Sequence, residues 1–429
     1  MTDTGIKQEG LNKITEINGI AVYNINTGRF KTNTINIFFQ DNLSKETIAL
    51  NALLPSVLRR GTKKLPTLKD INLYLEELYG AVFDCGIVKK GERQILHFYF
   101  EYLSDKYASG DHSNFESALE FLLDIIYNPA LEKGSFNPQY VEQEKNNLKI
   151  LIESRTNDKV QYALDRCYEL MCGDEPFGLY EYGTPEQVDS ITPEDLYRHY
   201  MDKIGSLPMT IFITGELSKS HIDHIKTILS GIGRGTVKAL NAGIVKKFPD
   251  SVRYFEDAMD VNQAKLSLGF RTNITSREDD YYALMVYNGI LGGGMHSKLF
   301  QNVREKAGLA YYVFAGLEKF KGLMIIGSGI DVKEKDHAQE LILKQIEDIK
   351  AGNISDYEFN STIKSLETGV QALKDSQLQV VDFYFSQLIS QTHDTLEGLL
   401  SKIQRVARED VVRVAGKIQL DTVYFLTAV

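Results

Sequence analysis

One segment of the chain combines a run of glycines with a cation and a phenol. The residues that could contact a bound chain there are Gly292, Gly293, Gly294, Met295, His296, Ser297, Arg304 and Tyr311. Glycine readily adopts positive φ and allows another backbone to approach closely, so the glycine run predicts a turn. Apolar residues at helical spacing predict an amphipathic helix from Ser297 to Gly308 after it. Because Arg and Tyr side chains donate hydrogen bonds, the segment predicts a surface that handles peptides.

The elements that must position this segment occur twice along the chain in the same order. Alternating apolar residues predict two strand stretches in each copy, at 20–23 and 34–39 in the first and at 252–255 and 264–270 in the second. A helix and a turn follow in each copy, at 45–58 with Arg60-Gly61-Thr62 and at 279–291 with the glycine run. Each copy then continues with a helix, strands and long helices, and ends in a strand, at 209–214 and 422–427. The chain therefore reads as a duplication.

Strands mixed with helices in this order predict an α+β fold. We expect two homologous domains, each with a mostly antiparallel sheet covered by helices on one face. The predicted boundaries place the first half-repeat at 1–233, a glycine-rich linker at 234–247 and the second half-repeat at 248–429.

Composition limits the classes of partner. The 429 residues are 43% hydrophobic and 25% charged, which is typical of a folded protein with more than one domain. A net charge of −10 argues against nucleic acid and anionic membranes as partners. The polar opening sequence and the lack of a long apolar run predict a cytoplasmic protein. Cys85, Cys167 and Cys172 form no metal or disulfide pattern and are expected to be free thiols.

The histidines offer no obvious metal site. His221 and His224 are three residues apart, but their polar surroundings predict a solvated helix face. His97 alternates with Phe98 and Phe100, as a structural residue in a strand does. His296 is expected to face solvent in the glycine turn. Motifs for a nucleophilic serine or for nucleotide phosphates are also missing.

The string from Gly292 to Tyr311, GGGMHSKLFQNVREKAGLAY, resembles the C-terminal half-repeat of the insulinase/pitrilysin superfamily of zinc peptidases. The matching pattern in the processing-peptidase-like branch is GGGMSSRLFxxVRExxGLAY. The resemblance covers nearly the whole chain and implies one half of a clamshell made of two such halves.

The same resemblance implies that the metal site is degenerate. Active members carry HxxEH on a helix, where two histidines bind zinc and the glutamate activates water. Aligning the turn after that motif with Arg60-Gly61-Thr62 puts Ala52, Pro55 and Ser56 at the three motif positions. The third ligand position falls at Leu151, which Glu144 and Glu153 flank. No zinc is therefore expected in this chain.

The family's two-subunit enzymes imply a role for such a chain. It would be the non-catalytic, substrate-binding and activating subunit of a heterodimeric zinc endopeptidase, whose HxxEH-bearing partner holds the zinc. Arg304 and Tyr311 would act in trans on an extended peptide substrate, unless Arg304 pairs with Glu305 or Glu318. The alternatives are a scaffold or peptide-binding protein without a proteolytic partner, and a hydrolase with an unorthodox metal site. A homodimer is a further expected form of the isolated chain.

Overall fold

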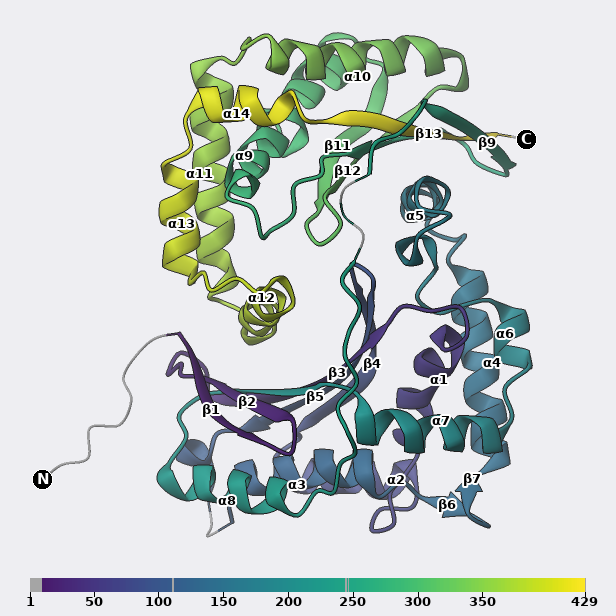
Figure 1. Cartoon of the computed structure of the whole chain (residues 1–429), viewed down its shortest axis with the longest axis vertical. Helices are drawn as coiled ribbons and strands as arrows, with labels where there is room; N and C mark the ends of the chain where they lie inside the picture. Colours follow the sequence, from purple (N-terminus) through teal and green to yellow (C-terminus); the bar gives the residue numbers. More distant parts are fainter. Residues whose placement is uncertain (1–9, 110–111, 244, 246, 429) are drawn as a thin grey trace, which may run out of the picture. The chain divides into compact units, whose positions relative to one another are not determined.

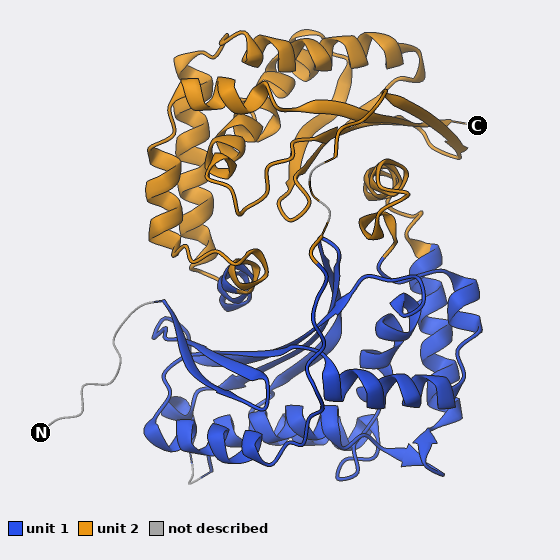
Figure 2. Cartoon of the chain, viewed as in Figure 1, with its two compact units in different colours: residues 1–153, 181–241, 377–384 blue, residues 154–180, 242–376, 385–429 orange. Residues whose placement is uncertain are grey.

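The computed structural model describes residues 10–109, 112–243, 245 and 247–428. Residues 1–9, which contain the polar opening, and residues 244 and 246 of the expected linker lie outside this description. The chain forms two compact units (Figures 1 and 2). Unit 1 comprises residues 1–153, 181–241 and 377–384, and unit 2 comprises residues 154–180, 242–376 and 385–429.

Unit 1 is built on a six-stranded sheet with the order β1-β2-β8-β3-β5-β4. Its strands are β1 (Leu11–Ile17), β2 (Ile20–Ile25), β3 (Thr32–Asn42), β4 (Val82–Lys90), β5 (Arg93–Leu103) and β8 (Met209–Thr214). All neighbours pair antiparallel except β2 and β8. The strand β4 lies at one end of the sheet, and among the described residues no strand pairs with its outer edge.

Helices cover one face of this sheet (Figure 1). They are α1 (Ile48–Leu58), α2 (Leu68–Glu77), α3 (Asn114–Tyr127), α4 (Pro138–Ser154), α6 (Pro185–Asp189), α7 (Pro193–Ser206) and α8 (Lys219–Ser230). A short hairpin, β6 (Leu131–Glu132) and β7 (Ser135–Phe136), and a 3-10 turn, η1 (Asp105–Tyr107), complete the unit's own elements. The hydroxyl of Ser113 accepts a hydrogen bond from the backbone N–H of Glu116, which caps α3.

Unit 2 is built on a five-stranded sheet with the order β11-β12-β10-β13-β9. Its strands are β9 (Arg253–Met259), β10 (Ala264–Arg271), β11 (Ala310–Glu318), β12 (Leu323–Ile330) and β13 (Gln419–Ala428). Its helices are α5 (Lys159–Met171), α9 (Asp280–Gly292), α10 (Lys335–Lys350), α11 (Asp356–Leu373), α13 (Leu396–Gln404) and α14 (Arg408–Ala415). Three shorter helical elements are η2 (Pro176–Gly178), η3 (Leu299–Lys306) and η4 (Val332–Glu334).

The two sheets share one plan, which confirms the predicted α+β fold and the duplication. Read from the edge, β4-β5-β3-β8-β2 corresponds to β11-β12-β10-β13-β9. The parallel pair of β2 and β8 also recurs as β9 and β13. The edge strands β4 and β11 are therefore equivalent elements of the two units.

Two helices contain residues that belong to the compact unit formed mainly by the other half of the sequence. The helix α5 comes from the first half but packs on β10, β12 and β13 of unit 2. It covers the sheet face that carries Phe314, whereas the next residue, Ala315, meets α9 on the opposite face. In turn, the first residues of α12 (Gln377–Ser390) belong to unit 1, where Gln377 donates a hydrogen bond to the Thr32 carbonyl. The compact units thus differ at these two helices from the contiguous halves 1–233 and 248–429.

Candidate functional site

The helix α1 is the element on which the metal motif was expected. Its apolar residues are buried on nearly all sides, and Asn51 lies at the centre of a buried polar network. The Asn51 amide donates to the Asp41 carboxylate and to the Gln94 side chain, both at 3.0 Å. Because that amide nitrogen is used as a donor, the Asn51 carbonyl oxygen accepts from His199 Nε2 at 2.7 Å. This network fixes α1 against β3, β5 and α7.

The side chains at the three motif positions of α1 cannot bind zinc as the HxxEH motif does. Ala52 and Pro55 are buried and have no side-chain donor atom for a metal. Ser56 is half-buried and lines a cavity of about 410 Å³. A neutral hydroxyl alone is a poor zinc ligand.

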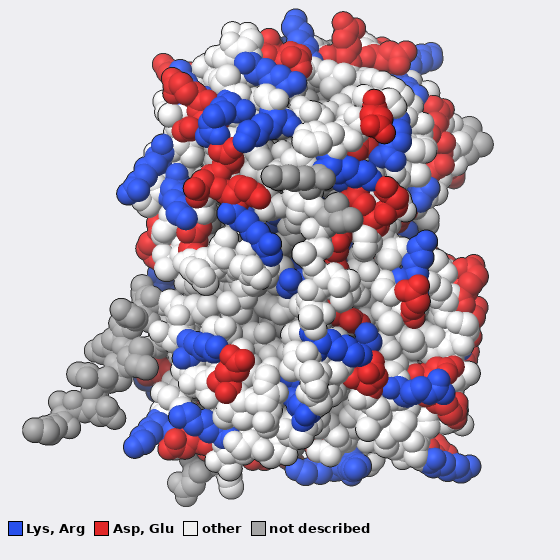
Figure 3. Space-filling view, in the orientation of Figure 1, with Lys and Arg blue, Asp and Glu red and all other residues white. Residues whose placement is uncertain are grey.

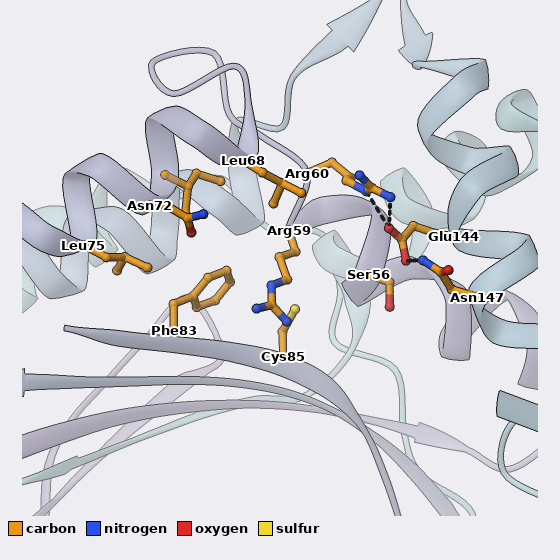
Figure 4. Close-up of a pocket in the computed structure, with 11 residues that line it drawn as sticks. Ser56, Arg59, Arg60, Leu68, Asn72, Leu75, Phe83, Cys85, Glu144 and Asn147 are labelled. Carbon is orange, nitrogen blue, oxygen red and sulfur yellow. Dashed lines mark hydrogen bonds and ion pairs between the residues drawn. The ribbon is translucent and has the colours of Figure 1, made fainter. Parts of the chain in front are cut away.

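An ion pair lies in this cavity beside the motif helix (Figure 4). Arg60 Nε is 2.5 Å from Glu144 Oε1, and a second guanidinium nitrogen contacts the same oxygen. The other carboxylate oxygen accepts from Asn147 at 3.1 Å. Arg60 also lies over the Tyr140 ring. The cation that neutralises Glu144 is therefore a guanidinium supplied by the chain itself.

Glu144, rather than Leu151, is the α4 residue that lies beside Ser56. Both side chains project from the same helix, but Glu144 and Asn147 line the cavity whereas Leu151 is exposed elsewhere on α4. Sequence analysis placed Leu151 at the third ligand position and Glu144 beside it. The seven-residue offset equals two helical turns, which periodicity alone cannot distinguish.

Arg60 and its neighbour Arg59 were not identified as site residues from the sequence. Arg60 was read only as the first residue of a turn. That turn requires glycine at its second position, because a Cβ on Gly61 would lie 2.4 Å from the Pro66 carbonyl oxygen. The close turn after α1 is what directs both arginines toward the cavity.

The cavity offers no nucleophile with a base. Burial raises the pKa of the Cys85 thiol to about 12, and its Sγ is 3.2 Å from the Pro55 carbonyl oxygen. None of the described residues that line the cavity is a histidine, so the Ser56 hydroxyl has no imidazole to activate it there. Among the described residues, no group of three or more His, Cys, Asp or Glu side chains could hold a metal ion.

The histidines elsewhere in unit 1 have structural partners. His97 stacks on Phe38 and bonds Asn36, and burial lowers its pKa to about 4, in agreement with the predicted structural role. The prediction for His221 and His224 was wrong, because both are largely covered by α3. His221 packs on Phe115 and lies 3.4 Å from the Asp105 carboxylate.

The glycine run of unit 2 has a different geometry from the predicted one. None of Gly292, Gly293 and Gly294 has positive φ, so the expected left-handed turn is wrong. Gly292 is the last residue of α9, and a Cβ there would lie 2.5 Å from the Ala315 backbone nitrogen. Glycine is thus required at this position for close packing of α9 on β11. A Cβ on Gly294 would meet only the His296 ring, at 3.4 Å.

The residues after the glycines form an ordered turn with one exposed apolar side chain. Met295 projects into solvent, while its carbonyl accepts from the Gln301 side chain at 2.6 Å. Ser297 is buried. His296 is half-buried rather than solvent-facing, with Nε2 2.9 Å from the Thr362 hydroxyl, and burial lowers its pKa.

Arg304 projects from η3, which forms a π-helix instead of the expected α-helix. The wider winding is visible at its end, where the Ala307 N–H donates to the Asn302 carbonyl five residues earlier. Over eight residues the two helical periods predict nearly the same apolar positions, so the sequence pattern did not separate them. The guanidinium lies over the Phe300 ring and 3.6 Å from Glu305, and its side chain is 43% exposed.

Tyr311 lies at an irregularity of the edge strand β11. The β11–β12 register shifts between Ala310 and Tyr312, which leaves Tyr311 as the extra residue of a bulge. Its side chain is 65% exposed. The structure thus places Arg304 and Tyr311 on two elements that pack against each other, and both residues are exposed.

These observations define a class of protein: a duplicated α+β chain whose metal-motif helix carries no ligands and whose second unit keeps the glycine-run segment. Comparisons with known proteins agree with it. The family described as Peptidase M16 inactive domain matches residues 190–366. The probable inactive metalloprotease YmfF of Bacillus subtilis (strain 168) is 36% identical over 413 residues, which cover 95% of this chain and 96% of the relative.

Solved structures share the fold over the whole length. A conserved protein from Enterococcus faecalis V583 is 28% identical, with a TM-score of 0.90, over 98% of this chain and 99% of that one. A peptidase M16 inactive domain from Pseudomonas fluorescens has a TM-score of 0.79 at 18% identity, over 98% of each chain. The chain belongs to the M16 peptidase superfamily, as an inactive member. Within the described residues, no helix is both long and apolar enough to span a membrane.

Proposed function

We propose that this chain is the substrate-binding and activating subunit of a two-subunit zinc endopeptidase. The observation that carries the proposal is the Arg60–Glu144 ion pair beside Ser56. In this chain a guanidinium neutralises the carboxylate, whereas an active relative needs a zinc ion with an open coordination position. Catalysis would then require a second, HxxEH-bearing homologue that holds the zinc.

The role of this chain would rest on the exposed groups of unit 2. Arg304 and Tyr311 present a guanidinium and a phenol hydroxyl near an edge strand, where an extended peptide can add as a further strand. Such donors stabilise a carbonyl oxygen as it gains charge in the transition state. The cytoplasm is the proposed compartment, since the three cysteines are free thiols, which suits a reducing environment.

The test is to purify the chain alone and together with an HxxEH-bearing homologue from the same cell. We expect the chain alone to contain no stoichiometric zinc and to cleave no quenched fluorescent peptide. We expect the pair to contain zinc and to cleave the peptide. In the pair, Arg304→Ala and Tyr311→Phe should each lower kcat about a hundredfold. Lys306→Ala, which removes a neighbouring exposed cation of η3, serves as the matched control. Cleavage at an unaltered rate by both variants would contradict the proposal.

The second candidate is a peptide-binding scaffold without a proteolytic partner. It is favoured by one observation, namely that the Arg304 guanidinium lies 3.6 Å from Glu305 and over the Phe300 ring, contacts that a structural role would also explain. If the chain binds extended peptides but no HxxEH-bearing homologue co-purifies with it or gains activity from it, the scaffold is the better conclusion.

A further inference from the structure

The cavity of unit 1 has two unlike walls (Figure 4). The apolar wall is formed by Leu68, Ile71 and Leu75 of α2 and by Phe83, with Asn72 of α2 on the same side, and the polar wall by Ser56, Arg59, Arg60, Glu144 and Asn147. Its volume of about 410 Å³ is in the range of sites that enclose small ligands. A ligand that fits both walls needs an apolar body and a polar end.

The polar wall carries one cation whose carboxylate partner is exposed. Glu144 is the one carboxylate among the described residues that line the cavity, and Arg60 and Asn147 occupy its two oxygens. Arg59 then remains, with a side chain that is 48% exposed. Its contact is with Asp84 at 3.3 Å, and because that carboxylate is 68% exposed the pair is weak and easily exchanged. Arg59 is therefore the cation of this wall that can exchange its exposed partner for an incoming carboxylate.

The edge strand of the sheet contributes side chains to this cavity, so a peptide bound along that edge would lie next to it. Phe83 and Cys85 of β4 line the cavity, and the outer edge of β4 pairs with no described strand. A peptide that adds to this edge runs along the strand whose side chains form one wall. Arg59 lines the same cavity, and an arginine is well suited to a carboxylate, which it can bind through two parallel hydrogen bonds.

We propose that this cavity binds the C-terminal residue of an extended peptide, with its apolar side chain against the α2 wall and its free carboxylate on Arg59. The inference rests on the proposed peptide-binding function and specifies which part of the ligand unit 1 would hold. The cavity left by the lost metal motif would thereby serve to fix the end of a bound chain.

The experiment measures binding of a fluorescein-labelled nonapeptide of alternating Thr and Val that ends in Leu, by anisotropy, on the full chain. The peptide is prepared as the free acid and as the C-terminal amide. We expect the acid to bind about tenfold tighter than the amide, as expected for a hydrogen-bonded charge pair. Arg59→Gln should abolish that difference, and Arg59→Lys should restore only part of it. Arg198→Gln is the matched control, because Arg198 is also exposed and 3.3 Å from an aspartate in unit 1.

Small probes separate the cavity from the peptide-binding function. N-acetyl-leucine should displace the acid peptide, and N-acetyl-leucinamide should not. Equal binding of the acid and amide peptides to the wild-type chain would overturn the inference and leave the peptide-binding function standing. Binding of N-acetyl-leucine through Arg59 without any binding of the peptides would overturn the assignment of a peptide end. Binding of neither peptide nor N-acetyl-leucine would contradict both proposals.

Discussion

The α1 region of unit 1 and the segment from Gly292 to Tyr311 in unit 2 use their polar side chains in opposite ways. Around α1, charged and polar groups are paired with one another, as Arg60 is with Glu144 and Asn51 is with His199. In unit 2, the Arg304 side chain is 43% exposed, with its ion-pair partner Glu305 at 3.6 Å, and Tyr311 is 65% exposed. Buried groups that bind one another stabilise a fold, whereas exposed donors are accessible to a ligand. The same chain therefore combines a buried, internally paired polar site with an exposed segment whose donors are accessible to a ligand.

Introducing the metal-binding motif into α1 should change the difference between the two regions most. Ala52→His, Pro55→Glu and Ser56→His together restore the motif, and Arg60→Ala releases Glu144. We expect the wild-type chain to contain no stoichiometric zinc and the fourfold variant to bind about one zinc per chain, since two imidazoles and a carboxylate make a three-ligand site. Metal analysis after dialysis measures this.

The control identifies the third ligand. Adding Glu144→Gln to the fourfold variant should remove the zinc. A further Leu151→Glu substitution in that variant should not restore zinc binding, because Leu151 lies outside the cavity. If zinc content follows residue 151 instead of residue 144, the assignment of Glu144 is wrong.

The ion pair and the exposed arginine should differ in their effect on stability. Arg60→Gln or Glu144→Gln leaves one charge unpaired, and since these side chains are only 17% and 13% exposed the expected loss is about 2 to 3 kcal/mol. Arg304→Gln should change the free energy of unfolding by less than about 0.5 kcal/mol, as is usual at exposed positions. Calorimetric unfolding of each variant compares them. Equal losses for Arg60→Gln and Arg304→Gln would contradict the structural role of the pair.

How far the sequence predicted these regions depended on the range of the interactions. Alternation and helical periodicity placed the strand Met209–Thr214 and the helix Asp280–Gly292, predicted at 209–214 and 279–291, because those patterns are local. The exchange of α5 and α12 was not predicted, since an apolar helix face does not specify which sheet it will cover. The pairing of Arg60 with Glu144 was missed for the same reason, because the two residues are far apart in sequence and each alone is an ordinary surface type.

The glycine run provides a sharper test of geometry within unit 2. Gly292→Ala would place a Cβ 2.5 Å from the Ala315 nitrogen and should cost about 1 to 3 kcal/mol through overpacking of α9 on β11. Gly294→Ala meets no backbone atom within 4 Å and should be within about 0.5 kcal/mol of the wild type. Thermal unfolding distinguishes the two. A large loss for Gly294→Ala would indicate that backbone conformation, rather than packing, requires glycine there.

One histidine in each region should make the free energy of unfolding depend on pH. His199 is buried and His296 is half-buried, so the effect of His199 should be larger. Burial lowers the pKa of His199, behind α1, to about 4, and lowers that of His296 in the turn as well. A histidine with a depressed pKa stabilises the fold fully above its unfolded pKa of about 6.5, and this contribution is lost as the pH falls toward the folded pKa. For His199 the loss between pH 7 and pH 5 should be about 1 to 2 kcal/mol.

His199→Gln keeps a donor for the Asn51 carbonyl and should therefore flatten the pH dependence of the unfolding free energy between pH 7 and pH 5. His296→Gln should flatten it less, because its side chain is less buried than that of His199. His337→Gln, at an exposed site, is the control and should leave the slope unchanged. The slopes come from urea unfolding at a series of pH values. If His199→Gln retained the full wild-type slope, the acid sensitivity would have to arise from other groups, and the polar network behind α1 would not distinguish this region from the turn.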